Sequence, residues 1–127
     1  MAFRWDHVHL RSLDPERAAG FYVTMFGAAP LASTQTGAGL RCVVDLDGLK
    51  LFIEQVTLDI PAAPDPPYRG LEHFGLAVEN LDAAAAELKR RGAVFLMEPR
   101  TARPGLRVAF VQGPDNVRIE LVDRTAA

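Results

Sequence analysis

The sequence predicts an α+β fold made of two βαβββ modules, and three observations carry this prediction. The first is an internal repeat, the second is the alternation of apolar and polar residues along several short segments, and the third is one helix signal in each half of the chain. With the sequence shifted by 66 residues against itself, the matched pairs are His7 with His73, Leu10 with Leu76, Gly39-Leu40-Arg41 with Gly105-Leu106-Arg107, and Ile53-Glu54 with Ile119-Glu120. Such agreement in one frame indicates two homologous modules.

The repeat also sets the domain organisation. The chain of 127 residues has the length of a single domain, 1–127, and we divide it into module one at 5–56, a linker at 57–70 and module two at 71–123. The linker, TLDIPAAPDPPYRG, contains four prolines, which interrupt both strand ladders and helices. We therefore expect two small folded modules joined by an irregular segment.

Module one begins with residues 5–11, whose alternation predicts a strand. Asp14 is placed to cap a helix with Pro15 as its first residue, and this helix should end at Gly27. Three strands are expected next, near 31–36, 39–46 and 49–56, with Asp47-Gly48 as the hairpin turn between the last two.

Module two repeats this order after a first strand that begins at His73. Asn80 should cap a helix that runs through AAAAELKRR and ends at Gly92. Three strands are expected next, near 93–98, 106–112 and 117–123, with GPDN at 113–116 in the place of the Asp47-Gly48 turn. The two sheets should therefore be small and mostly antiparallel.

Alternation divides each sheet into an aliphatic face and a polar face. The aliphatic face should lie beneath the helix, because successive strand residues point to opposite faces and only one face is wholly apolar. The polar face is predicted to carry Trp5, His7, His9, Arg11, Arg41, Val43, Phe52 and Glu54 in module one, and His73, Arg107 and Glu120 in module two. A face that mixes apolar walls with His, Glu and Arg is typical of a lined cavity, and a plain solvated face is the alternative.

Two His and two Glu at repeated positions indicate a divalent-metal site. The four residues are His7, Glu54, His73 and Glu120. Imidazole and carboxylate ligands suit nickel, zinc, cobalt, manganese or iron. The alternatives are histidines held by structural hydrogen bonds, and glutamates paired with Arg41 or Arg107 one strand away. The shared repeat favours the metal interpretation, since two related modules would bring all four side chains around one axis.

Charge and composition argue against several classes of protein. The net charge is −2 and no basic cluster is denser than Lys89-Arg90-Arg91, which argues against nucleic-acid binding. The apolar runs are far shorter than the roughly 18 residues of a membrane-spanning helix, and the N-terminus has no signal-like apolar region. The single cysteine, Cys42, permits no internal disulfide. We therefore expect a cytoplasmic protein that acts on a small molecule.

Three segments resemble the vicinal oxygen chelate superfamily, which includes glyoxalase I, methylmalonyl-CoA epimerase, extradiol dioxygenases, and the fosfomycin and bleomycin resistance proteins. They are HVHLRSLDPERAAGFYVTMFG, EHFGLAVENLDAAAAELKRRG and GPDNVRIELV. The resemblance implies paired βαβββ modules that form a cup-shaped mixed sheet around a metal, commonly in a homodimer. It implies ligands on the first and fourth strands of each module, at His7, Glu54, His73 and Glu120.

A metal site with four protein ligands is more similar to the sites of glyoxalase I and the epimerases than to those of the superfamily members that use three ligands. The resemblance implies proton abstraction from a small oxygenated substrate chelated to the metal, with Glu120 as the base. One departure is the segment QVTLD after Glu54, where glyoxalase I has an Asn-Trp-Gly segment. The leading hypothesis is a metal-dependent lyase, isomerase or epimerase.

Several basic residues are candidates for substrate binding. Arg11 and Arg69 match arginines that contact the carboxylates of glutathione in glyoxalase I. Arg41 and Arg107 could hold an anionic substrate tail, because guanidinium groups recognise carboxylates and phosphates. His9 lies two residues beyond His7 on the same face, and it is a candidate for an additional acid, base or substrate contact, with a structural histidine as the alternative.

Two other functions are also consistent with the sequence. The first is a metal-dependent dioxygenase or a resistance-type transferase, in which only three of the ligands bind iron or manganese. The second is a non-enzymatic drug-binding protein of the bleomycin-resistance kind, with an apolar groove in the dimer and no metal. The four intact ligand positions favour an enzyme.

Overall fold

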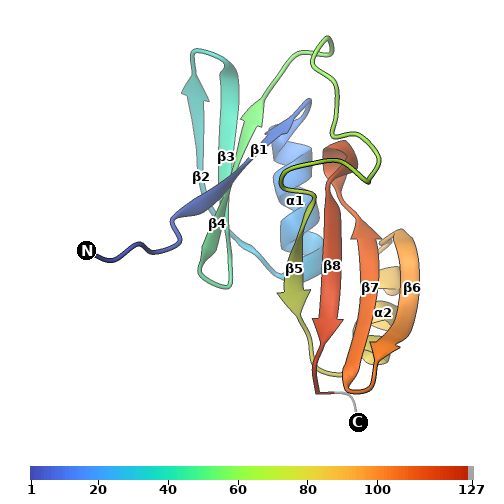
Figure 1. The fold of residues 1–127 in the computed structure, drawn as a ribbon. Helices are drawn as coiled ribbons and strands as arrows, with labels where there is room; N and C mark the ends of the chain where they lie inside the picture. The colour runs from blue at the N-terminus through green and yellow to red at the C-terminus, as the bar shows by residue number, and fades with distance from the viewer. Residues whose placement is uncertain (126–127) are drawn as a thin grey trace. The chain divides into compact units, whose positions relative to one another are not determined.

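The computed structural model describes residues 1–125 and confirms the α+β fold with two βαβββ modules. The chain divides into two compact units, residues 1–62 and the chain from residue 63 onward. Within each unit, one helix packs on one face of a four-stranded sheet (Figure 1). The boundary between the units falls inside the predicted proline-rich linker. Within the described residues, neither helix is long and apolar enough to cross a membrane.

The first unit contains one helix and four strands. Their bounds are β1 His7–Ser12, α1 Pro15–Phe26, β2 Ala29–Thr36, β3 Gly39–Leu46 and β4 Leu49–Gln55. The strands lie in the order β1-β4-β3-β2, so that β4 has β1 on one side and β3 on the other. The β1–β4 pair is parallel and the other pairs are antiparallel, which makes the sheet mixed.

The second unit repeats this topology. Its elements are β5 His73–Ala77, α2 Leu81–Arg90, β6 Phe95–Arg103, β7 Leu106–Gln112, a short 3-10 turn Pro114–Asn116 and β8 Arg118–Asp123. The strand order is β5-β8-β7-β6, with β5 parallel to β8 and the other pairs antiparallel. In both units the first and last strands of the module are therefore neighbours, although they are far apart in the sequence.

The helices begin where the sequence predicts them. The Asp14 side chain accepts a hydrogen bond from the Arg17 backbone N–H at 3.1 Å, and Pro15 is the first helical residue. The Asn80 side chain accepts one from the Ala83 backbone N–H at 3.2 Å. Gly27 ends α1 in the left-handed conformation at φ 72°, which costs a glycine little because it has no Cβ.

Each hydrophobic core lies between the helix and the aliphatic face of its own sheet. In the first unit the fully buried side chains include Tyr22 of α1 and, on the sheet, Val44, Leu51 and Ile53. In the second unit they include Leu81 of α2 and, on the sheet, Val111, Ile119 and Leu121. Burial of one such aliphatic side chain stabilises the fold by about 1.5–3 kcal/mol. The cores thus fix which face of each sheet remains for polar side chains.

Strand β7 differs from its prediction. The residues expected on the polar face of the sheet, such as Arg107, lie on the helix side, and those expected on the helix side lie on the polar face. Residues 113–117 connect β7 to β8, whereas the matching β3–β4 turn is Asp47-Gly48, which is three residues shorter. An odd difference in loop length places the opposite set of strand residues on the helix side. Arg107 is consequently paired with Asp123, and Phe110 rather than Arg107 is the neighbour of Glu120.

Candidate functional site

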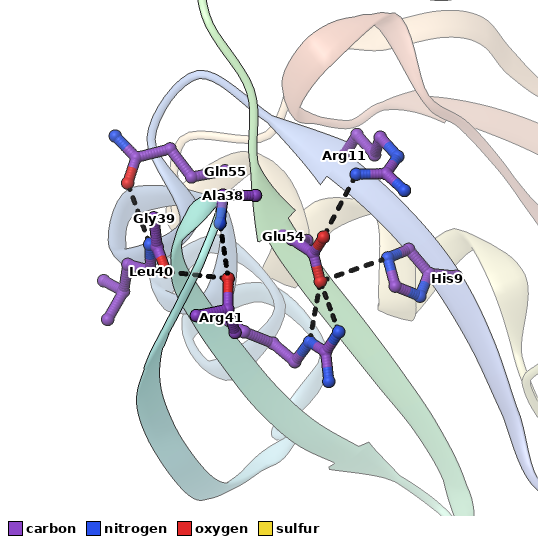
Figure 2. A network of polar contacts seen from close by, with 9 residues as sticks. His9, Arg11, Ala38, Gly39, Leu40, Arg41, Glu54 and Gln55 are labelled. Carbon is purple, nitrogen blue, oxygen red and sulfur yellow. Dashed lines mark hydrogen bonds and ion pairs between the residues drawn. The ribbon is translucent and has the colours of Figure 1, made fainter.

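Glu54 is the centre of the polar face in the first unit. It lies on β4 between the two neighbouring strands, with Arg11 of β1 as its Cα partner on one side and Arg41 of β3 on the other. Side chains at paired positions point to the same face of a sheet. Figure 2 shows both guanidinium groups directed at the Glu54 carboxylate.

Both oxygens of this carboxylate accept hydrogen bonds from arginine. Arg41 Nε donates to Glu54 Oε1 at 2.9 Å, and Arg41 Nη2 donates to the same oxygen. Arg11 Nη1 donates to Glu54 Oε2 at 3.2 Å. The hydrogen bond from Arg41 holds the pKa of the Glu54 carboxyl below its usual value, although burial of the carboxyl acts in the opposite direction. Glu54 is therefore a stably ionised, charge-paired group.

The turn before β3 holds Arg41 at this position. Gly39 has a φ of +124°, and a Cβ built there would lie 2.6 Å from Gln55 Oε1. That same oxygen accepts a hydrogen bond from the Leu40 backbone N–H at 3.0 Å (Figure 2). Thr36 Oγ1 donates to the Gly39 carbonyl at 3.0 Å. Gly39, the glycine in the first copy of the Gly-Leu-Arg tripeptide, thus serves the backbone conformation of this turn, where a side chain would not fit.

His9 lies beside the Glu54 cluster, with its Nε2 at 3.8 Å from Glu54 Oε1. Burial lowers the pKa of His9 below its usual value of 6.5, and the negative charge of Glu54 opposes this shift. The imidazole is therefore mainly neutral near pH 7. This position is consistent with a substrate contact, as the sequence suggested, and also with a structural histidine.

His7 is farther along β1 and has different neighbours. Its Cα partner on β4 is Lys50, four residues before Glu54, and its ring stacks on Phe52 with a centroid separation of 4.1 Å. His7 Nδ1 lies 2.6 Å from the Asp6 carboxylate. The structure therefore brings His9, and not His7, next to Glu54.

His73 and Glu120 are brought together on the polar face of the second unit. His73 Nε2 lies 3.5 Å from Glu120 Oε1, and His73 Nδ1 lies 3.1 Å from Glu72 Oε1. The rings of His73 and Phe110 are nearly perpendicular, at 85°, with their centroids 5.0 Å apart. Glu120 itself remains partly exposed.

An acidic residue precedes and contacts the first-strand histidine in both units. Asp6 contacts Nδ1 of His7, and Glu72 contacts Nδ1 of His73. Metal-binding histidines almost always direct their second ring nitrogen at a carboxylate, a carbonyl or a water, which fixes the ring and its tautomer. Sequence reasoning missed Asp6 and Glu72, although the signal was available as an acid-His dipeptide at both repeat positions.

A metal ion fits part of the predicted ligand set better than the rest. Within either unit, the described residues include no group of three His, Cys, Asp or Glu side chains arranged around one point. His73 and Glu120 have suitable donor atoms and a supporting carboxylate, so they fit a divalent metal. Glu54 does not fit in this arrangement, because guanidinium groups bind both of its oxygens.

The two remaining arginine candidates, Arg107 and Arg69, both belong to the second unit. Arg107 Nη2 donates to Asp82 at 2.7 Å, and Arg107 Nη1 donates to Thr101 at 3.1 Å. Arg107 is thus hydrogen-bonded to Asp82 of α2 and does not lie beside Glu120, because the exchange of faces in β7 places it on the helix side of the sheet. Arg69 is exposed in the segment that precedes β5.

Known structures share this fold over nearly the whole chain. A glyoxalase family protein from Enterococcus faecalis is 22% identical, with 91% of this chain and 94% of that chain covered and a TM-score of 0.78. TnmS3, an antibiotic binding protein from Streptomyces sp. CB03234, is 24% identical, with 96% of both chains covered and a TM-score of 0.73. No curated protein matches the chain.

A mutant of the fosfomycin resistance protein FosX from Listeria monocytogenes, complexed with Mn(II) and dihydroxypropylphosphonic acid, is also similar. It is 19% identical, with 95% of this chain and 90% of that chain covered and a TM-score of 0.73. These likenesses show the fold. The sequence-family model of the Glyoxalase/Bleomycin resistance protein/Dioxygenase superfamily matches residues 4–121, nearly the whole sequence. With its two βαβββ units, the chain therefore belongs to that superfamily.

Proposed function

We propose that this protein is a metal-dependent enzyme of the glyoxalase type, a lyase, isomerase or epimerase that removes a proton from a small oxygenated substrate. The observation that carries the proposal is the His73–Glu120 pair, in which Nε2 and Oε1 are 3.5 Å apart while Glu72 contacts the other ring nitrogen. The pair combines the two ligand types of a divalent-metal site with the supporting carboxylate that such a site uses.

His73 and Glu120 of the second unit are the residues that we assign to the metal, and the sequence repeat adds His7 as a further predicted ligand. His7 is included because Asp6 contacts its Nδ1 as Glu72 contacts that of His73. Nickel, zinc, cobalt, manganese and iron all accept such ligands. A divalent ion stabilises the negative charge that develops on a substrate oxygen when a neighbouring C–H proton leaves.

Glu120 is the residue that we assign to proton removal. Its carboxylate is partly exposed, so a substrate can reach it, and no arginine is its Cα partner on either neighbouring strand. Glu54 lacks this freedom, because two arginines bind it. The two glutamates of the repeat therefore have separate tasks in this proposal.

The metal content of the purified protein and its variants tests the proposal. The unmodified protein should contain about one divalent ion per chain, and His73→Ala should lose it. Glu98→Ala is the matched control, because Glu98 is an exposed residue that pairs with Lys89 on the surface of the same unit. Full metal retention in His73→Ala, or protein that binds no divalent ion even when supplied with each candidate, would contradict the proposal.

A small-molecule binding protein without catalysis is the second candidate. The Arg11–Glu54–Arg41 cluster favours it, because such a cluster can hold a ligand but contains no activated nucleophile or unpaired base. The solved structure of TnmS3 is that of an antibiotic binding protein with the same fold. If the metal-free protein binds a ligand and no solvent deuterium is exchanged into that ligand, the result would support this candidate over the enzyme.

A further inference from the structure

The environment of Glu54 differs sharply from that of Glu120, its counterpart in the sequence repeat. Glu54 has Arg11 and Arg41 as its two cross-strand partners. The partners of Glu120 are Gly75 and Phe110. The same position in the two sheets therefore has two arginines as cross-strand partners in one unit and none in the other, so that the two glutamates need not do the same chemistry.

We propose that Glu54 is a positioning residue that holds Arg11 and Arg41 side by side as a two-armed receptor for an oxyanion group of a ligand, and that it does not bind the metal. The group recognised would be a carboxylate or a phosphate-like group. This proposal goes beyond the enzyme function above and does not depend on it, because it concerns only residues of the first unit.

Charge is the first argument for an anion. The two guanidinium groups and the one carboxylate that they bind leave one net positive charge. A divalent cation placed on Glu54 would lie close to both guanidinium groups and would be repelled by them. An oxyanion placed on the arginines would instead be attracted by the excess charge.

Donor capacity is the second argument. A guanidinium has five N–H groups, and Glu54 takes two donor nitrogens from Arg41 and one from Arg11. The Arg11 side chain is 55% exposed and that of Arg41 is 36% exposed, whereas Glu54 is 10% exposed. The Glu54 carboxylate thus lies at the buried bottom of the cluster, and the two arginines are the part that a ligand can reach.

Rigidity is the third argument. Arg41 is held at its backbone by the Gly39 turn, and its Cζ lies 5.7 Å from the centre of the Phe52 ring. Arg11 is held by Glu54 on the neighbouring strand (Figure 2). Guanidinium groups fixed in this way lose less conformational entropy when they bind an oxyanion, so fixed arginines bind more tightly than mobile ones.

A titration of the purified protein with inorganic phosphate and with acetate, at constant ionic strength, tests the proposal. The readout is the NMR signal of the arginine Nε–Hε groups. We expect saturable shifts at Arg11 and Arg41 and none at Arg90, an exposed α2 residue that pairs with Glu87. Stronger shifts with phosphate than with acetate would identify the phosphate-like ligand class, and the reverse would identify the carboxylate class. Shifts that are linear and equal at all three arginines would overturn the proposal.

Variants then test the role of each residue. Arg11→Gln and Arg41→Gln should each weaken anion binding about tenfold, the loss expected for one charge-assisted contact, and Arg90→Gln should leave it unchanged. If either Gln variant fails to fold, the matching Lys variant keeps the charge and removes the planar fork, and it should bind several-fold more weakly. Unchanged affinity in the folded variants would overturn the proposal.

Glu54→Asp isolates position from charge. The shorter side chain keeps the negative charge but cannot reach both guanidinium groups, so phosphate or acetate binding should weaken while the fold, followed by the backbone amide spectrum, is retained. Binding as tight as in the unmodified protein would rule out a positioning role.

Two comparisons separate this proposal from the enzyme proposal. Glu54→Ala should keep the metal content of the unmodified protein, and metal loss as in His73→Ala would show that Glu54 is a ligand after all. His73→Ala should still bind the anion at Arg11 and Arg41. If the unmodified protein proves to bind no metal, the enzyme proposal fails, while the anion titration still decides the present one.

Discussion

His73 and Glu120 face each other across the parallel strands β5 and β8, with His73 Nε2 3.5 Å from Glu120 Oε1. Their Cα register is offset by two residues, since Glu120 pairs with Gly75. In the first unit the same offset places His9, and not His7, nearest to Glu54. By strand register, His9 is therefore the counterpart of His73. By the contact between ring Nδ1 and the preceding acidic residue, the counterpart of His73 is His7.

The first prediction separates these two assignments. His7→Ala should lower the metal content strongly, because Asp6 supports the His7 ring as Glu72 supports that of His73. His9→Ala should retain the metal, because His9 belongs to the positively charged cluster around Glu54. Elemental analysis of both variants after the same purification provides the measurement. Metal loss in His9→Ala with retention in His7→Ala would reverse the assignment.

The second prediction concerns the base. Glu120→Gln keeps the shape of the side chain and removes its basicity, so turnover should fall by about 10²-fold or more. Exchange of solvent deuterium into candidate 2-oxo and 2-hydroxy compounds measures this step without knowledge of the product. Glu98→Gln serves as the surface control. Equal exchange rates for Glu120→Gln and the unmodified protein would remove Glu120 from this role.

The third prediction is a dependence of stability on pH that arises from Glu54. Arg41 lowers the pKa of the folded-state Glu54 carboxyl below its usual value of 4.5. Its stabilising contribution is therefore complete above the unfolded-state pKa, and it is lost as the pH falls through the lower pKa of the folded state. Thermal unfolding measured from about pH 6 down to about pH 3 should show a smaller loss of stability in Glu54→Gln than in the unmodified protein. Parallel curves for the two proteins would contradict this prediction.

The fourth prediction concerns the turn that carries Arg41. Gly39→Ala should destabilise the protein by about 1–3 kcal/mol, because a side chain is strained at φ +124° and its Cβ would lie 2.6 Å from Gln55 Oε1. Gly37→Ala is the matched control, since a Cβ there meets nothing within 4 Å. Chemical denaturation of the two variants gives the difference. Equal stability would show that Gln55 and the turn adjust freely.

The fifth prediction is a homodimer, as the superfamily resemblance implies. Strand β1 is an edge strand of its sheet, and the segment before it exposes Phe3 and Trp5 at 90% and 87%. Exposed apolar side chains next to an open edge favour association. Light scattering should give twice the 13.9 kDa mass of the chain, and the fluorescence of Trp5, the single tryptophan, should shift to longer wavelength on dilution. A monomer at micromolar concentration would refute it.

The sequence by itself determined the local structure. Asp14 and Asn80 were recognisable as helix caps because their side chains satisfy backbone N–H groups a few residues away. Alternation placed Ile53 in the core and Glu54 on the opposite face, and the 66-residue repeat indicated the second module. Such features depend on neighbours along the chain, so they can be read without knowledge of the fold.

Only the tertiary structure decided which side chains meet. Glu54 is bound by both Arg11 and Arg41 because β4 lies between β1 and β3, and Arg11 is far from the other two residues in sequence. Arg107 left the polar face because the β7–β8 connection is three residues longer than the β3–β4 turn. Side chains alternate with a period of two, so an odd change in loop length reverses a whole strand, and local sequence similarity does not reveal it.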